Sequence, residues 1–219
     1  LGESWQSYRQ KWAQDISSTD ADIAWIAVPP GDHVPQLCEA CLDAGCHTVI
    51  EKPWIYSSDV TEHLKIVAKR LNLKVGVNYQ YLFLNEIVEA FETNFSRVAN
   101  TATVELIFTT SKPKRRDISP FYNLGSHLFA IKKRAFDGLG ISAMNFCCGK
   151  SDQRAIRIVD QYGACIRHID FTQSSEPLLQ RFINEFIRCI HAKEPFISDL
   201  AFAYEVNCAM TSEQVETMF

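Results

Sequence analysis

The feature that most constrains the fold is a pair of short apolar runs that both stop abruptly in polar or proline-bearing residues. The first run covers residues 23–28 and leads into the sequence PPGDH at 29–33, and the second covers residues 48–50 and leads into EKP at 51–53. Continuously apolar runs of this length are typical of parallel strands that are covered on both faces. Ligands bind outside the carboxyl ends of such strands, so the two loops are candidates for a binding site.

The segments around these runs have the periodicity of helices. Residues 33–44 form an amphipathic pattern that ends before Gly45, where a left-handed backbone is easily adopted. Ser57 and Ser58 precede a second apolar stripe that extends to Leu71, and residues 74–78 read as a third strand. Alternating strands and helices predict a parallel sheet with right-handed crossovers. A further helix is expected before the first strand, over residues 5–14.

The pattern changes after about Tyr79. Residues 103–109 alternate between apolar and polar side chains, as expected of a strand with one buried face. Further strands are predicted at 143–148, 155–160 and 164–170, and further helices at 83–91, 178–190 and 200–217. A turn at residues 161–163 joins two of these strands into a hairpin. The fold class is therefore α/β plus α+β: an incomplete parallel sheet over residues 1–80, then a mostly antiparallel sheet domain with helices on one face over residues 81–219.

Composition narrows the possible partners. The formal net charge of −4 gives no global attraction for nucleic acid or for an anionic membrane, and no apolar stretch reaches the roughly 20 residues of a membrane span. The eight cysteines lie within apolar periodic segments, which favours reduced thiols in the cytoplasm. Cys38 and Cys41 follow helical spacing with Val34 and Leu37, so we expect small core residues there and no metal site.

The two loops together resemble the Gfo/Idh/MocA family of nicotinamide-dependent oxidoreductases. The resemblance lies in the pair P-P-x-x-H at 29–33 and A-G-x-H-x-x-x-E-K-P at 44–53, and a weaker match is N-L-G-S-H at 123–127. It implies an incomplete Rossmann-type domain whose glycine-rich phosphate loop would precede Leu1. The one G-x-G-x-x-G/A match, at 138–143, follows a helical run and precedes a strand, so it predicts a turn and not a dinucleotide site.

The resemblance also implies roles for individual residues. The catalytic residues would be Lys52 and His127. The Lys52 ammonium can stabilise the alkoxide-like charge that develops during hydride transfer. His127 would be a general acid/base, since the ordinary pKa of histidine lies near physiological pH. The residues implied to bind the cofactor, NAD or NADP, are Pro29, Pro30, His33, Glu51, Lys52 and Pro53. The residues implied to bind the substrate are Asn78, Tyr79, Gln80, Asn123 and His127.

The sequence departs from the family pattern at two places. Asn123 stands where the family usually has an aspartate, and an amide cannot take a proton. Leu82 and Phe83 stand where an arginine is common. The expected function is hydride transfer between nicotinamide and a sugar or polyol-like substrate. A catalytically inactive cofactor-binding regulatory or scaffold protein and an NAD-assisted glycosidase remain alternatives. The expected partners are a small hydroxylated substrate and further copies of the chain, joined through the second-domain sheet.

Overall fold

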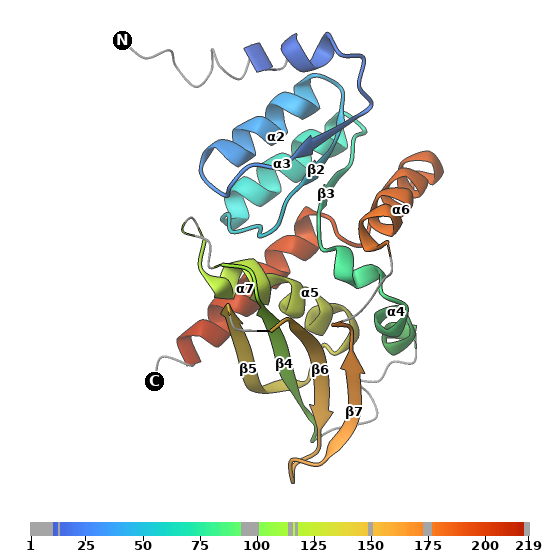
Figure 1. The fold of residues 1–219 in the computed structure, drawn as a ribbon. Coiled ribbons are helices and arrows are strands. Elements are labelled where there is room, and N and C mark those ends of the chain that lie inside the picture. Colours follow the sequence, from blue (N-terminus) through green and yellow to red (C-terminus); the bar gives the residue numbers. More distant parts are fainter. Residues whose placement is uncertain are drawn as a thin grey trace. The chain divides into compact units, whose positions relative to one another are not determined.

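The computed structural model describes residues 11–12, 14–92, 101–113, 116, 118–148, 151–172 and 177–216. The chain divides into two compact units (Figure 1). The first comprises the chain up to Asn78 together with Ile183–Cys208, and the second comprises Tyr79–Phe182 and the chain from Ala209. The helix expected at residues 5–14 lies mostly outside the described residues, although residues 11–12 and 14–17 are helical.

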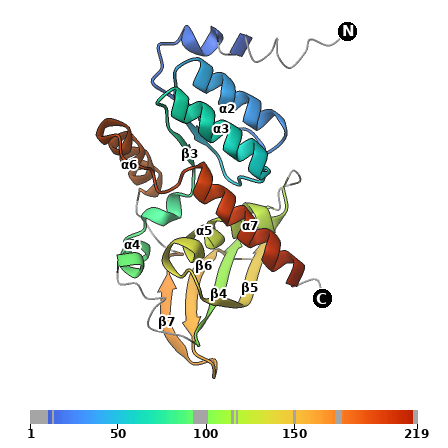
Figure 2. The ribbon, with the colours of Figure 1, turned by 180° about the vertical axis from the view of Figure 1, so that it is seen from behind.

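The first unit contains the predicted parallel sheet. Its strands are β1 (Ile23–Ile26), β2 (His47–Ile50) and β3 (Val75–Val77), in the order β1-β2-β3, and both pairings are parallel. The strands are connected by α2 (His33–Asp43) and α3 (Ser58–Arg70), which lie side by side (Figure 2). The carboxyl ends of the three strands therefore meet at one edge of the sheet, as the apolar runs predict.

Local signals explain where these helices begin and end. Gly45, which follows the C-cap residue Ala44 of α2, has φ +84°, and the Cys46 N–H donates to the Cys41 carbonyl at 3.0 Å, which completes a glycine-terminated helix end. The Ser57 hydroxyl accepts from the Val60 N–H at the start of α3. The predicted stripe of α3 is buried in its middle, whereas Leu71, the residue that caps the helix, is 39% exposed.

A distant segment completes the outer side of β3. The Val77 N–H donates to the Ser198 carbonyl at 2.8 Å, and the Ser198 hydroxyl donates to the Val77 carbonyl at 2.6 Å. Gly76 faces the rings of Phe186 and Phe196, and a Cβ at this position would lie 2.9 Å from the Phe196 ring. Residues of α6 (Leu178–Ala192) and of the loop before α7 (Leu200–Glu216) thus belong to the core of the first unit.

The second unit is built on a four-stranded mixed sheet (Figure 1). Its strands are β4 (Thr103–Thr110), β5 (Gly140–Cys148), β6 (Gln153–Val159) and β7 (Cys165–Asp170), in the order β5-β4-β6-β7. The β4–β6 and β6–β7 pairs are antiparallel, whereas β5 runs parallel to β4. The helical elements of this unit are η1 (Gln80–Phe83), α4 (Asn85–Glu92), the π-helical turn η3 (Phe121–Gly125) and α5 (Ser126–Ala135).

The buried face of β4 and two turns of the second unit agree with the sequence predictions. Val104, Leu106 and Phe108 are buried on one face of β4, where α5 packs. Gly163, in the predicted hairpin between β6 and β7, has φ +81°. Gly138 has φ +90° and lies in the turn between α5 and β5, so the G-x-G-x-x-G/A match is a helix-to-strand connection, as expected from its context.

Candidate functional site

One carboxylate connects the carboxyl ends of all three strands of the first unit. Glu51 follows β2, and its Oε1 accepts hydrogen bonds from Trp25 Nε1 at 3.2 Å and from Asn78 Nδ2 at 3.0 Å. Trp25 belongs to β1 and Asn78 directly follows β3. Side chains from three crossover-connected strands therefore meet at a shared acceptor, which fixes the orientation of the groups at this edge.

The loop after β1 is held to the segment after β2. The Tyr56 hydroxyl donates to the Gly31 carbonyl at 2.8 Å, and the Gly31 N–H donates back to the same hydroxyl at 3.2 Å. Burial raises the pKa of Tyr56, so the phenol remains protonated and able to donate. A Cβ at Gly31 would lie 2.8 Å from the His33 ring, so a larger residue in the loop that carries Pro29, Pro30 and His33 would force the imidazole to move.

Lys52 and Pro53 lie next to this hydrogen-bonded carboxylate. The Lys52–Pro53 peptide bond is cis, Pro53 is buried and Lys52 is partly exposed. The next residue, Trp54, is 1% exposed, and its Nε1 donates to Thr61 Oγ1 at 2.9 Å, which anchors the segment to α3. Lys52 thus carries an ammonium on a well-anchored loop at the carboxyl end of a parallel strand.

Asn78 also has a free acceptor. Its Oδ1 is buried and has no hydrogen-bond partner among the residues that the structure describes, although its Nδ2 is bound to Glu51. A buried amide oxygen without a donor is unfavourable, so a ligand with a hydroxyl or carboxamide N–H would complement it.

His127 lies within an aromatic cluster in the second unit. It is the second residue of α5 and is 7% exposed. The centroid of its ring lies 4.8 Å from that of Tyr81, 6.2 Å from that of Tyr79 and 6.1 Å from that of Phe108, to which it is nearly parallel at 15°. Burial raises the pKa of Tyr81, and the positive charge of Arg154 partly opposes this shift. The cluster therefore offers an imidazole and phenols in a poorly solvated environment.

The remaining candidate residues lie on elements adjacent to this cluster. Asn123 is part of the π-helical turn η3, which continues directly into α5, and its backbone N–H donates to the Ser119 carbonyl at 2.9 Å. Gln80 begins η1, the element that also supplies Tyr81. The structure thus brings Glu51 and Asn78 together in the first unit, and Tyr79 and His127 together in the second.

The predicted set omits several residues of these clusters, including Trp25, Tyr56, Tyr81 and Arg154. The apolar run predicts only a strand at Trp25, although an indole near a strand end can donate a hydrogen bond. Tyr56 and Arg154 carry no local signal, because their partners Gly31 and Phe108 are remote in the sequence.

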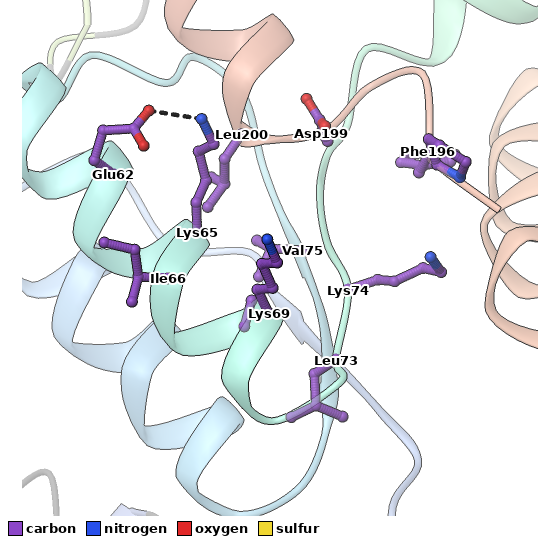
Figure 3. A pocket seen from close by; sticks show the side chains of 12 residues that line it. Glu62, Lys65, Ile66, Lys69, Leu73, Lys74, Val75, Phe196, Asp199 and Leu200 are labelled. Carbon is purple, nitrogen blue, oxygen red and sulfur yellow. Dashed lines mark hydrogen bonds and ion pairs between the residues drawn. The ribbon is translucent and has the colours of Figure 1, made fainter. Parts of the chain in front are cut away.

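A cavity of about 490 Å³ lies beside the amino end of β3 and contains none of the predicted residues (Figure 3). Lysine and apolar side chains from α3, β3 and the segment before α7 line it. Lys65 pairs with Glu62 at 2.6 Å, and Lys74 Nζ donates to the Glu194 carbonyl at 2.7 Å. Because this cavity adjoins the opposite end of β3 from Asn78, we treat it as separate from the candidate site.

The structure gives no support for a metal site or a membrane span in the part of the chain that it describes. No group of three or more His, Cys, Asp or Glu side chains there could hold a metal ion, and no helix there is long and apolar enough to cross a bilayer. Cys38 and Cys41 are buried free thiols, and burial raises the pKa of Cys41 to about 11, which keeps it protonated. Both therefore serve as core residues, as their spacing predicts.

Comparison with known proteins identifies relatives of both the sequence and the fold. Residues 3–79 match the GFO_IDH_MocA family model, described as an oxidoreductase family with an NAD-binding Rossmann fold. The uncharacterized oxidoreductase YfiI of Bacillus subtilis (strain 168) is 32% identical over 76 residues, or 34% of this chain. That match spans only 19% of the length of YfiI.

Solved structures extend the likeness over nearly the whole chain. A putative oxidoreductase from Magnetospirillum magnetotacticum superimposes with a TM-score of 0.72 at 17% identity, covering 91% of this chain and 82% of that one. An inositol dehydrogenase homolog from Azotobacter vinelandii, complexed with NADH and myo-inositol, gives 0.66 at 16% identity, with coverage of 93% and 78%. At these identities the likeness establishes the fold, a Rossmann-like parallel unit followed by a mixed-sheet unit.

Proposed function

Because residues 3–79 match the Gfo/Idh/MocA oxidoreductase model, we propose that the chain is a member of this family and uses NAD or NADP to oxidise or reduce a sugar or polyol-like substrate. The observation that carries this proposal is the convergence of Trp25, Glu51 and Asn78 at the carboxyl edge of the parallel sheet, directly beside Lys52. This is the edge at which open α/β sheets bind their ligands.

The residues at this edge suit the nicotinamide part of such a cofactor. When bound, the nicotinamide ring takes up or gives up a hydride. The buried Asn78 Oδ1 is an acceptor that a carboxamide or hydroxyl can satisfy. Among the described strands β1, β2 and β3, none leads into a glycine-rich turn of the kind that cradles a pyrophosphate. The residues proposed to hold the cofactor are Pro29, Pro30, His33, Glu51, Lys52 and Pro53.

The chemistry proposed for this chain's own side chains is proton handling at the substrate oxygen. The Lys52 ammonium donates a hydrogen bond to that oxygen and stabilises the negative charge that develops on it. His127 takes up or returns the proton, in surroundings from which the aromatic rings exclude much of the water. The residues proposed to bind substrate hydroxyls are Asn78, Tyr79, Gln80 and Asn123, together with His127.

A regulatory or scaffold protein that binds the cofactor without turnover is the second candidate. It is favoured by Asn123, because an amide at this position cannot exchange a proton with His127. An NAD-assisted glycosidase would use the same residues but would leave the cofactor unchanged overall. Net accumulation of NADH therefore separates the dehydrogenase from both alternatives.

The experiment combines cofactor binding with turnover. The purified protein is titrated with NADH and NADPH by tryptophan fluorescence, and then incubated with NAD or NADP and a panel of aldoses, inositols and glycosides. We expect binding of at least one cofactor and net formation of its reduced form with at least one polyol or aldose. Failure to bind either cofactor contradicts the proposal, and binding without any turnover favours the regulatory protein.

The same proposal includes a cytoplasmic homo-oligomer that assembles through the second-unit sheet. Ile166, on the edge strand β7, is 50% exposed, and Tyr162, at the adjoining hairpin, is 84% exposed. Sedimentation of wild type and Ile166→Glu tests this arrangement. We expect the variant to shift toward the monomer, and a wild-type monomer at all concentrations contradicts it.

A further inference from the structure

Arg154 lies against the aromatic cluster around His127, although nothing in its local sequence points to a site. It is the second residue of β6 and stands directly opposite Phe108 of β4 in the antiparallel register. Its Cζ lies 5.3 Å from the centroid of the Phe108 ring and 5.9 Å from that of the Tyr81 ring. The same two rings contact His127.

The backbone around Arg154 is firmly held. Its N–H donates to Thr172 Oγ1 at 2.8 Å, and its carbonyl accepts from the Phe171 N–H at 2.9 Å. The Phe171 ring in turn lies 5.6 Å from that of Tyr81. The position of the guanidinium beside the His127 cluster is therefore set by strand pairing and ring packing.

The guanidinium charge faces rings where a carboxylate would be expected. Its Nε is buried and has no hydrogen-bond partner among the residues that the structure describes. Asp152, two residues earlier, accepts a hydrogen bond from the Ser111 N–H, and chiefly this bond holds its pKa below the usual range. The positive charge of Arg154 lowers this pKa further, as a smaller cause. Aromatic faces attract a guanidinium but offer no hydrogen-bond acceptor, so the buried Nε of Arg154 remains unsatisfied among the described residues.

We infer that Arg154 binds an anionic oxygen group, a carboxylate or a phosphate, carried by the hydroxylated substrate. A planar guanidinium presents paired donors that match such groups in a bidentate manner. The surrounding rings lower the local polarity and so strengthen this pairing. The inference rests on the proposed function, in which His127 acts at the substrate oxygen, and it narrows the substrate class from neutral polyols to acidic sugars.

The test compares sugars that differ only in this group. Calorimetric titrations use matched pairs of a hexose and its uronate, in the gluco, galacto and manno series, and the corresponding hexose 6-phosphates. We expect the acidic member to bind about tenfold or more tightly than the neutral one in at least one series, the range expected of a charge-assisted hydrogen bond. Whether the uronate or the phosphate binds more tightly identifies the anionic group.

Variants assign this preference to the residue. Arg154→Met should abolish the preference, whereas Arg154→Lys should retain part of it, because the charge remains and the fork is lost. The matched control is Arg157→Met on the same strand. Arg157 lies three residues further along, so its side chain leaves the opposite face, where it pairs with Glu105 at 2.6 Å. This control should keep the full preference.

The outcomes separate this inference from the proposed function. Equal binding or no binding of both members in every series overturns the inference, as does a preference that survives in Arg154→Met. NADH titration of the same samples reports on the proposed function independently. If the protein prefers the uronate in a manner that depends on Arg154 but does not bind NADH, the anion-binding role of Arg154 is supported and the proposed dehydrogenase function is contradicted.

Discussion

The two ends of the parallel sheet in the first unit differ in how their polar groups are used. At the carboxyl end, Trp25 and Asn78 converge on Glu51 from separate strands, in an arrangement that only the fold creates. Beside the amino end of β3 lies the 490 Å³ cavity, but its Lys65 pairs with a glutamate one helical turn away. We therefore place the candidate site by the convergence of side chains from separate strands and not by the size of a cavity.

The largest expected effect contrasts lysines at these two ends. Lys52→Met should lower kcat by about 10³-fold, because the developing charge on the substrate oxygen loses its stabilising ammonium. The cofactor Kd should remain close to that of wild type. Lys69→Met, in the lining of the cavity, should leave kcat unchanged. Steady-state kinetics measure kcat for both variants. An equal decrease in kcat for Lys52→Met and Lys69→Met would contradict the proposed difference between the two ends of the sheet.

His127→Gln should give the next largest effect. Removal of the acid/base should lower kcat by about 10²-fold and flatten the pH–rate profile on the limb that reports on this group. His63→Gln is the matched control, because His63 is an exposed histidine of α3 that contacts Glu39 at 3.1 Å. An unchanged pH–rate profile in His127→Gln would restrict this histidine to a structural role.

Glu51→Ala should destabilise the first unit by about 2 kcal/mol, since two donors lose their shared acceptor. Glu62→Ala removes an exposed carboxylate that pairs with Lys65 one helical turn away, so its effect should stay below about 1 kcal/mol. Urea unfolding of both variants measures the difference. Equal destabilisation would mean that the hydrogen-bonded carboxylate at the carboxyl end has no special structural role.

The smallest effect is a pH dependence that originates in the core between the two ends. Burial raises the pKa of Cys41 from 9.0 to about 11, so the unfolded chain releases this proton at a lower pH than the folded one. The stability contribution is therefore complete below pH 9 and falls as the pH rises, by about 1 kcal/mol between pH 9 and pH 10. Urea unfolding should show a shallower decline in Cys41→Ala than in wild type, whereas Cys165→Ala, at an exposed thiol, should decline as wild type does.

The sequence was sufficient where signals are local. The parallel strands, the glycine end of α2, the serine cap of α3 and the hairpin at Gly163 all follow from residues within one or two turns of each other. The buried face of β4 follows from simple alternation. These patterns predict the fold class because each one indicates either the backbone conformation at a position or the buried face of a helix or strand.

The rest depends on long-range pairing that periodicity does not encode. Nothing local indicates that Ser198 binds the backbone of Val77, or that β5 runs parallel to β4. Likewise, Arg154 reaches the His127 cluster only because β6 pairs with β4 in one particular register. The roles of Lys52 and His127 remain predictions drawn from a family resemblance. The substitutions described above test them.

Lysine footprinting tests the central claim, that the carboxyl edge of the sheet holds the cofactor, most directly. The protein is acetylated briefly with and without NADH, and labelling of each lysine is measured by mass spectrometry. At a free NADH concentration ten times its Kd, labelling of Lys52 should slow by about tenfold, because about a tenth of the protein remains unbound. Lys65 and Lys69, beside the cavity, should be labelled as before. Unchanged labelling of Lys52 together with protection of the cavity lysines would contradict the account.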